Sequence, residues 1–245
     1  MNRHNSHSRK WVLIDYKLAD SGKVLEKEER LALKAGEMKI PPFLELWIPS
    51  RKCFVLGKVY ATRLTESQRK NLTEARIPIY IRASGGGLIL HDPTCLNFGL
   101  AVPREIIPEQ WGIDRIFFTL SSGVVLALQK LKICVYHGKV KVFCPGSFDL
   151  LVKKKKIAGL SLLVREKFCL LHGTLFVQAD SQYLETLERF YGPAIRDEII
   201  SLQRLKNDSV NMEDITLQIV KGYQESLNVI FKPLRNPDFL LNFSE

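Results

Sequence analysis

Strand patterns recur through the first three quarters of the chain, and helix patterns fill most of the last quarter. Short apolar and β-branched runs between turn residues continue to residue 177, and apolar residues spaced three or four apart follow from residue 182. Strands mixed with segregated helices favour an α+β fold over a doubly wound parallel sheet. We predict a mixed or antiparallel sheet with flanking helices, in a single domain of residues 10–235. Residues 1–9 and 236–245 are predicted to be poorly ordered tails.

The predicted elements follow from the spacing of apolar residues between turn signals. Strands are expected at 11–16, 43–48, 53–56, 78–81, 88–90, 96–102, 139–143, 148–152, 156–163 and 168–177. Helices are expected at 23–34, 66–75, 114–132, 182–190, 194–205 and 212–227. No internal repeat or linker interrupts this series, which supports a single domain.

Composition excludes several classes of protein. With 46% apolar residues among 245, the chain is neither disordered nor fibrous, and no apolar stretch reaches the ~18 residues of a membrane span. Five cysteines cannot all pair and form no C-x-x-C spacing, which predicts a reduced, cytoplasmic protein. The net charge of +10 favours an acidic partner, but it does not choose between nucleic acid, an anionic membrane surface and an acidic protein.

Several common catalytic motifs are missing from the sequence. It contains no phosphate loop of the G-x-x-x-x-G-K-[ST] type, no G-x-G-x-x-G, no H-E-x-x-H and no G-x-S-x-G. The five histidines have no tight metal-ligand spacing outside the polar amino terminus, so no metal site is expected. The basic residues are scattered without a recognition-helix or aromatic RNA-binding pattern, so we do not expect a nucleic-acid partner.

The first informative segment runs from Arg82 to Gly87 and ends in three glycines. Three residues without Cβ atoms allow a ligand or another chain to approach the backbone closely and permit positive φ. The segment leads into a strand and not into a helix, so the wall of a binding channel is a better interpretation than a helix-terminus anion site. An ordinary hairpin loop is the simpler alternative.

The second segment pairs a cysteine with a lysine twelve residues later. Cys144 stands at a Pro-Gly turn, where side chains are commonly exposed, and Lys156 begins the next predicted strand. A thiol is a nucleophile as the thiolate, which a nearby ammonium stabilises, and a lysine can also return a proton to a leaving amine. Taken alone, a cysteine is more often a buried apolar filler, and the lysine run 153–156 is more often a solvated turn.

A third segment contains His172, which lies between apolar strand residues and by itself indicates only a structural histidine. In this order and spacing, the three segments together resemble the biotin/lipoate protein ligase and octanoyltransferase superfamily. The resemblance implies the α+β catalytic core of that superfamily, which is similar to class II synthetases. It also implies a catalytic Cys144 and Lys156 and a set of substrate-binding residues: Arg82, Ser84, Gly85, Gly86, Gly87, His91, Asn97, Ala158, Gly159, His172, Gly173 and Thr174.

Cys144 discriminates between the branches of the superfamily. The segment Cys-Pro-Gly-Ser-Phe-Asp-Leu looks most like the cysteine-dependent amidotransferase branch. That resemblance implies octanoyl transfer, without ATP or another cofactor, from the glycine-cleavage H protein to lipoyl domains of 2-oxoacid dehydrogenases. Acyl carrier protein is the alternative donor. Two other functions stay open: an ATP-dependent lipoate ligase in which Cys144 is incidental, and a non-catalytic nucleic-acid-binding module.

The hypothesised mechanism is a two-step transfer in which Lys156 holds Cys144 as the thiolate and the sulfur carries the acyl group. Backbone N–H groups near Gly159 or in the loop 85–87 are expected to stabilise the oxyanion. One geometric problem arises, because in a plain hairpin Lys156 opposes Leu151. Cys144 would then lie on the order of 20 Å from the lysine, unless the Pro145-Gly146 turn folds it back or the strand pairing differs.

Overall fold

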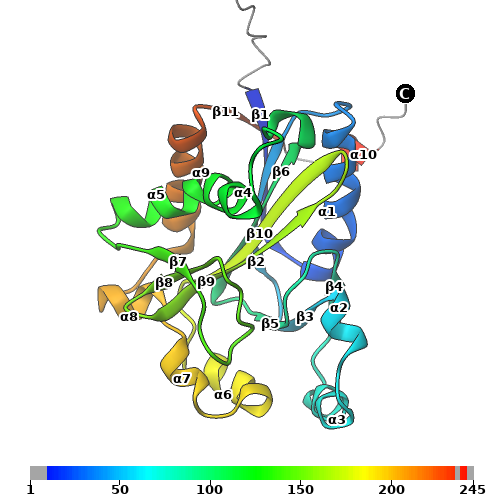
Figure 1. Ribbon diagram of the computed structural model, residues 1–245. Helices are drawn as coiled ribbons and strands as arrows, with labels where there is room; N and C mark the ends of the chain where they lie inside the picture. The colour runs from blue at the N-terminus through cyan, green and yellow to red at the C-terminus, as the bar shows by residue number, and fades with distance from the viewer. Residues whose placement is uncertain (1–9, 235–237, 242–245) are drawn as a thin grey trace, which may run out of the picture.

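The computed structural model describes residues 10–234 and 238–241, and within them the main sheet has eight strands (Figure 1). β11, β1 and β2 are parallel, and all the other neighbours are antiparallel. The mixed sheet confirms the predicted α+β class. The order across the sheet is β11 (Ile230–Pro233), β1 (Lys10–Ala19), β2 (Phe43–Pro49), β6 (Cys95–Pro103), β10 (Phe168–Phe176), β9 (Lys155–Val164), β8 (Asp149–Val152) and β7 (Tyr136–Gly138).

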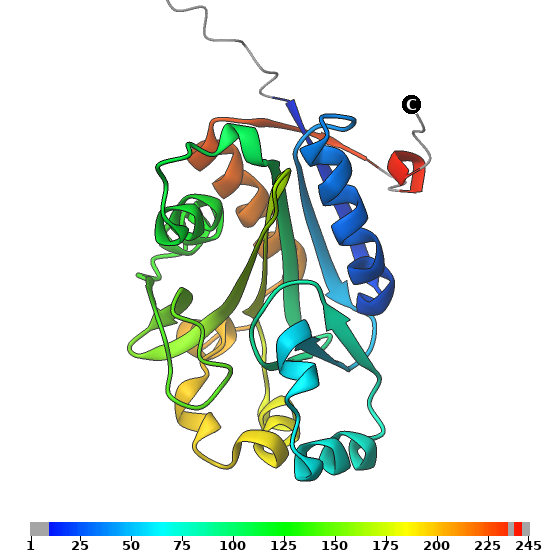
Figure 2. The same ribbon diagram turned by 45° about the vertical axis from the view of Figure 1, so that its right-hand side comes forward.

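A second, three-stranded sheet stands beside the lower end of the main sheet, below α1 (Figure 2). Its order is β4 (Ile79–Arg82), β3 (Cys53–Gly57) and β5 (Leu88–His91). The short helix α2 (Lys58–Thr62) and α3 (Glu66–Ala75) connect β3 to β4. Because β4 ends at Arg82 and β5 begins at Leu88, this small sheet presents the Gly-rich segment to the main sheet.

Helices cover the two faces of the main sheet differently. One face packs against α4 (Ile113–Leu120), α5 (Ser122–Lys130) and α9 (Met212–Leu227), and the other against α1 (Ser21–Gly36) and the small sheet (Figures 1 and 2). Alternation along β6 follows this division, since Leu96, Phe98 and Leu100 enter the core beneath the helices. Asn97 therefore faces the small sheet, where its side chain bonds with that of Thr174.

Helix α1 carries an unusual residue in its buried stripe. Asp20 caps the helix by accepting hydrogen bonds from the N–H groups of Gly22 and Lys23. The stripe follows helical spacing through Val24, Glu28 and Leu31, all buried. A fully buried carboxylate in an apolar stripe requires partners, and the functional site supplies them.

The structure divides two of the predicted helices. The helix expected at 114–132 is interrupted at Ser121, whose hydroxyl donates to the Phe117 carbonyl oxygen, 2.7 Å away. The helix expected at 194–205 is instead α7 (Ile195–Glu198) and α8 (Leu202–Lys206). Extended backbone at Ile199 separates them, because this residue pairs with Lys156 of β9.

Other differences concern strands and the ends of the chain. The strand predicted at 139–143 is wrong, since these residues form part of an irregular loop. β7, β11 and α2 were not predicted, and neither was the short helix η1 (Arg104–Ile106). The remaining helices are α6 (Ser181–Tyr191) and α10 (Asp238–Leu241), and α10 lies within the predicted carboxy-terminal tail. The predicted tail 1–9 and residues 242–245 lie outside the described residues.

Candidate active site

A narrow pocket lies between the main sheet and the small sheet. Three of its lining residues, Trp47, Thr174 and Gly159, belong to one row of neighbours across four strands, in which Trp47 pairs with Asn97, and Asn97 with Thr174. Thr174 in turn pairs with Gly159 of β9. The pocket volume is about 50 Å³, and the apolar part of its lining consists of Leu25, Trp47, Val55, Ile89 and Leu160. The row therefore leads from the buried indole of Trp47 toward the strand that carries Lys156.

Cys144 stands at the edge of this pocket in a strained backbone conformation. Its φ is +40°, in the left-handed region that non-glycine residues rarely adopt. The side chain is partly exposed, and Sγ accepts a hydrogen bond from the N–H of Gly87, with N and Sγ 2.9 Å apart. A Cβ atom at residue 87 would lie 3.3 Å from the sulfur, so glycine allows this close approach.

The Gly-rich segment is held in place by Arg82. The Nε–H of Arg82 donates to the Gly85 carbonyl oxygen, 2.9 Å away. Gly86 has φ +92°, and a Cβ atom there would lie 2.4 Å from the guanidinium group of Arg82. The backbone conformation therefore favours glycine at position 86, and a larger residue would also displace the guanidinium group of Arg82. Arg82 therefore fixes the conformation of the loop, and Gly87 at the end of the loop binds the sulfur of Cys144.

Lys156 is fully buried beside Cys144, and its ammonium has three oxygen partners. Nζ lies 2.6 Å from the Phe143 carbonyl oxygen and 2.9 Å from that of Cys144. It also forms an ion pair with Asp149 at 2.8 Å, in which both side chains are at most 2% exposed. All three ammonium hydrogens therefore have acceptors. The ammonium holds the backbone of Cys144 and not its sulfur, which differs from the hypothesised contact.

Asp149 connects the lysine to the loop and to β9. Besides Lys156, its carboxylate accepts hydrogen bonds from the N–H groups of Gly146, at 3.1 Å, and Leu160, at 2.8 Å. Burial raises the pKa of Asp149, while the charge of Lys156 and these hydrogen bonds oppose the shift. Sequence reasoning placed Asp149 in a motif but gave it no role.

Of the two ways to bring Cys144 near Lys156, the structure shows the fold-back and not a different strand pairing. Lys156 pairs with Leu151, as expected for the β8–β9 hairpin. The chain before β8 folds back over the hairpin, with Gly146 bonded to Asp149, so that the Cys144 carbonyl meets the lysine. The turn at Pro145–Gly146 therefore brings the two residues together.

A buried chain of polar groups supports the Gly-rich segment from behind. His172 lies with Nδ1 3.0 Å from a Glu28 carboxyl oxygen and with Nε2 hydrogen-bonded to the Ser84 hydroxyl. The Ser161 hydroxyl lies 2.8 Å from that of Ser84 and 3.0 Å from the Gly85 carbonyl oxygen. Burial and the charge of Arg82 lower the pKa of His172 to about 3, so the ring is neutral at neutral pH.

We expect Glu28→Gln to change how stability depends on pH. Burial raises the pKa of Glu28 from 4.5 to about 8, so the folded chain keeps a proton that the unfolded chain loses between these values. Glu28 therefore costs stability progressively as the pH rises above 4.5 toward its raised pKa. Glutamine does not titrate. Urea unfolding at several pH values should show a less steep decline for this variant than for the wild type.

The exposed neighbour Glu29 provides the control, since its side chain is 46% exposed and pairs at the surface with Arg165. Glu29→Gln should keep most of the wild-type pH dependence of the free energy of unfolding, because the charge of Glu29 is the smallest of the influences on the pKa of Glu28. Equal slopes for Glu28→Gln and the wild type would contradict the assignment of the raised pKa to Glu28.

The structure brings most of the predicted site residues to one pocket. Arg82, Gly86, His91, Cys144, Lys156, Gly159, His172, Gly173 and Thr174 line it. Ser84, Gly85, Gly87 and Asn97 lie behind the lining and bond to residues that form it. Ala158 instead packs into the core beneath the helices, on the opposite face of the sheet.

Four further residues belong to the site. They are Trp47, Glu28, Asp149 and Ser161. For Glu28, the acidic residue in an apolar helical stripe was an available signal. Burial and the charge of Arg82 lower the pKa of His91 to about 3, and its ring is held by the hydroxyls of Ser21 and Thr174.

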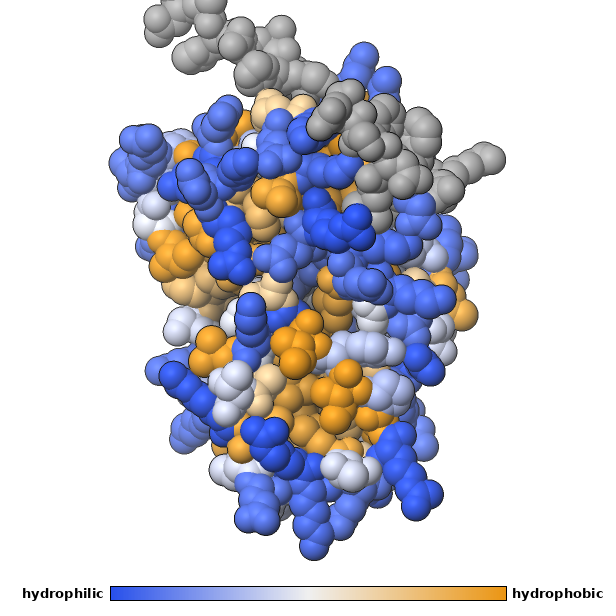
Figure 3. Space-filling view, turned by 90° about the vertical axis from the view of Figure 1, so that its right-hand side faces the viewer, coloured by the Kyte–Doolittle hydropathy of each residue, from blue (hydrophilic) through white to orange (hydrophobic). Residues whose placement is uncertain are grey.

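A wider groove adjoins the pocket on the side of α1, α2 and β4. Its volume is about 1020 Å³, and Arg82 lines both the groove and the pocket. Apolar side chains gather in the lower half of this side of the molecule (Figure 3). Val59, Ile79 and Ile81 are exposed apolar residues of α2 and β4. The pocket is thus bordered by a surface that combines apolar and charged residues.

The described part of the chain contains neither a metal-binding cluster of side chains nor a membrane-spanning helix. Within residues 10–234 and 238–241, no group of three His, Cys, Asp or Glu side chains is arranged to hold a metal ion. Over the same residues, no helix combines the length and the apolar character that crossing a membrane requires.

Comparison with known proteins identifies the family. Residues 20–224 match the family described as "Lipoyl protein ligase A/B catalytic domain". An "Octanoyl-[GcvH]:protein N-octanoyltransferase" of Kyrpidia tusciae is 31% identical over 171 residues, which are 63% of this chain and 57% of that protein. An "Octanoyltransferase LipM" of Exiguobacterium sibiricum is 23% identical over 92% of this chain and 90% of its own length. The resemblance inferred from the motifs is confirmed.

Solved structures show the same fold. Lipoate-protein ligase A bound with ATP superposes with a TM-score of 0.72 at 18% identity, covering 96% of this chain and 91% of that one. The putative lipoate protein ligase Ta0514 of T. acidophilum, with bound lipoic acid, also gives 0.72 at 18% identity, covering 95% and 92%. These likenesses confirm the predicted lipoate-ligase type of α+β core.

Proposed function

We propose that this protein, which belongs to the lipoyl protein ligase A/B catalytic domain family, transfers an octanoyl group to a lysine of a lipoyl domain through a thioester on Cys144. It is an acyltransferase of lipoate biosynthesis, in line with the octanoyltransferase names of its relatives. One observation carries the proposal of a thioester: Cys144 is partly exposed at an apolar pocket, in strained backbone, with its sulfur on a backbone N–H.

In the first step, the Cys144 sulfur attacks the carbonyl carbon of the octanoyl donor and a C–S bond forms. The bond from that carbon to the donor's leaving group breaks, and the thiol proton ends on the leaving nitrogen or sulfur. In the second step, a neutral lysine amine of the acceptor attacks the thioester and a C–N bond forms. The C–S bond then breaks, and a proton passes from the amine to the sulfur. One acyl group is exchanged, so the balance requires no ATP.

Lys156 positions the nucleophile in this mechanism and provides a positive charge beside it. Its three hydrogens are bound by the carbonyls of Phe143 and Cys144 and by Asp149. Proton transfer through Lys156 therefore requires one of these acceptors to be released first. The N–H of Gly87 is directed at the sulfur before reaction, which orients the lone pairs that attack.

The proposed donor is an octanoylated GcvH protein, the glycine-cleavage H protein, because two of the relatives are named for that substrate. Acyl carrier protein is the alternative donor. The proposed acceptors are lipoyl domains, for which the net charge of +10 favours acidic surfaces. Five free thiols support a reducing compartment, and we place the reaction in the cytoplasm.

Intact-mass spectrometry tests the proposal. The protein is mixed, without ATP, with octanoylated H protein or with octanoyl-acyl carrier protein, and the adduct is then chased with a lipoyl domain. We expect one octanoyl group on the enzyme, located at Cys144 by peptide mapping and lost to the lipoyl domain in the chase. The donor that forms the adduct faster identifies the natural substrate class.

Two outcomes would replace this function with one of the alternatives. Octanoylated or lipoylated product that forms only with ATP, and without an adduct on Cys144, would indicate a ligase. Absence of transfer from any donor, together with salt-sensitive binding of nucleic acid, would indicate a binding module.

A further inference from the structure

The loop that carries Cys144 is tied down by an acidic side chain from a distant part of the chain. Residues 139–148 form neither helix nor strand between β7 and β8. The N–H groups of Lys141, Val142 and Phe143 point together at the carboxylate of Glu198, with N–O distances of 2.8–3.0 Å. Consecutive N–H groups that converge in this way form an anion-binding concavity, and bonds to a carboxylate are the stronger kind.

The segment that carries Glu198 is also bonded to Lys156. Glu198 ends α7, and the next residue, Ile199, pairs with Lys156 in a parallel bridge. The N–H of Ile200 donates to the Lys156 carbonyl oxygen, 3.0 Å away. Ile195 and Ile199 are buried and fix this short segment in the core. Within three residues, one segment therefore bonds to the backbone of Lys156 and to the loop residues that directly precede Cys144.

We propose that Glu198 is a positioning residue that sets the place of Cys144 relative to Lys156. Glu198 binds the N–H groups up to Phe143, while Lys156 binds the carbonyls of Phe143 and Cys144. Strained backbone persists only where its surroundings over-determine it, and these two sets of bonds enclose the strained φ of Cys144. The inference rests on the proposed function for its kinetic test and on the hydrogen bonds alone for its structural test.

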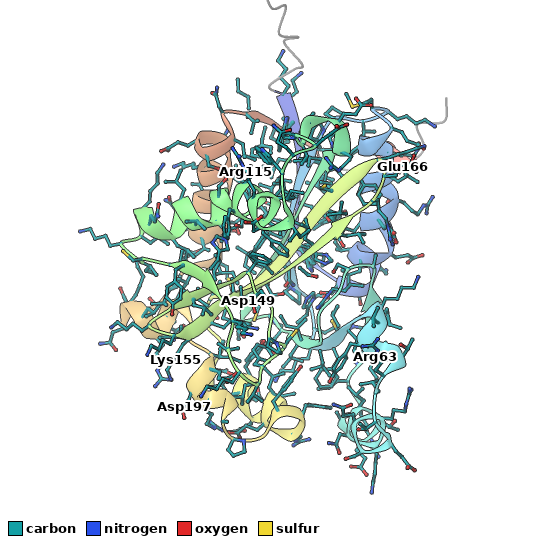
Figure 4. The ribbon with its side chains drawn as sticks, viewed as in Figure 1. Arg63, Arg115, Asp149, Lys155, Glu166 and Asp197 are labelled. Atoms are coloured by element: carbon teal, nitrogen blue, oxygen red, sulfur yellow. The ribbon has the colours of Figure 1, made fainter. Side chains whose placement is uncertain are left out.

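The adjacent acidic residue has no such role and offers a matched control. The Asp197 side chain is 92% exposed and lies 3.6 Å from Lys155, and the two are labelled near each other in Figure 4. Exposed pairs of this kind contribute little to stability. Asp197→Asn removes one negative charge from the same short helix without touching the loop.

Hydrogen exchange gives the structural test. In Glu198→Gln, the amide keeps one acceptor oxygen but turns an NH₂ group toward donors. We expect the amides of residues 141–143 to exchange at least about tenfold faster than in the wild type, with Asp197→Asn unchanged. Glu198→Asp restores a carboxylate on a shorter side chain and should give intermediate protection. Wild-type protection in Glu198→Gln would overturn the proposal.

Kinetics separate positioning from general loss of structure. We expect kcat to fall at least about tenfold in Glu198→Gln, with the KM for the lipoyl domain within about twofold of the wild type. Glu198→Asp should recover part of the loss and also serves if Glu198→Gln does not fold. A kcat within about twofold of the wild type for both variants would overturn the proposal. If the wild type forms no octanoyl adduct, the proposed function fails, and the exchange of residues 141–143 alone decides this inference.

Discussion

Replacing Cys144 by serine is expected to abolish the octanoyl adduct and to lower the rate of transfer by ~10³-fold or more. A serine hydroxyl is a weak nucleophile unless a base removes its proton, and the neighbouring Lys156 is a buried ammonium with three acceptors. The C–O bond of serine is also shorter than the C–S bond of cysteine, so the hydroxyl oxygen would reach less far toward the N–H of Gly87 than the sulfur does. Single-turnover transfer from the octanoylated donor, followed by intact mass, measures both effects.

Cys134 provides the matched control, because it is an exposed free thiol on the loop between α5 and β7. Cys134→Ser should form the adduct at the wild-type rate. Transfer at an undiminished rate by Cys144→Ser would show that the sulfur does not carry the acyl group.

Replacing Lys156 by methionine is expected to impair both stability and activity. Methionine fills similar space but leaves the buried carboxylate of Asp149 without its cation, which typically costs about 3–5 kcal/mol. The carbonyl of Cys144 also loses its donor, so the strained loop relaxes and acylation should slow by ~10²-fold or more. Urea unfolding and single-turnover acylation report the two losses separately.

A double variant distinguishes the two roles of Lys156. Adding Asp149→Asn removes the unpaired charge, so stability should recover substantially in the double variant while acylation stays slow. If acylation recovered together with stability, the lysine would act only through folding, and its proposed role in positioning the Cys144 sulfur would be wrong.

The α+β class could be predicted because strands and helices have different apolar periods, and most boundaries fell within a few residues. Residues 139–143 of the irregular loop were mistaken for a strand, since Val140 and Val142 alternate with lysines as strand residues do. The N–H groups of Lys141, Val142 and Phe143 are bound by the side chain of Glu198 from α7, and no local pattern records such a partner. The broken helix at Ile199 has the same origin, because its extended backbone pairs with Lys156.

The proposed catalytic pair could be inferred from the resemblance, but its geometry could not. The fold-back at Gly146 depends on Asp149, and the strained φ of Cys144 depends on bonds from two other segments. Residues that act behind the lining were harder to identify. Glu28 had a signal in its buried helical stripe, whereas Glu198 follows a run with ordinary surface composition.

The buried ammonium of Lys156 binds the carbonyl oxygen of Cys144, so the sulfur is held at a fixed position and is not carried on a mobile segment. Under the proposed mechanism, the donor and acceptor proteins must therefore bind one after the other, each bringing its reacting group to the same sulfur atom. The deacylated donor and the incoming acceptor compete for this binding site on the acyl-enzyme. Turnover should therefore slow as the deacylated donor accumulates, and a higher concentration of acceptor should relieve this inhibition.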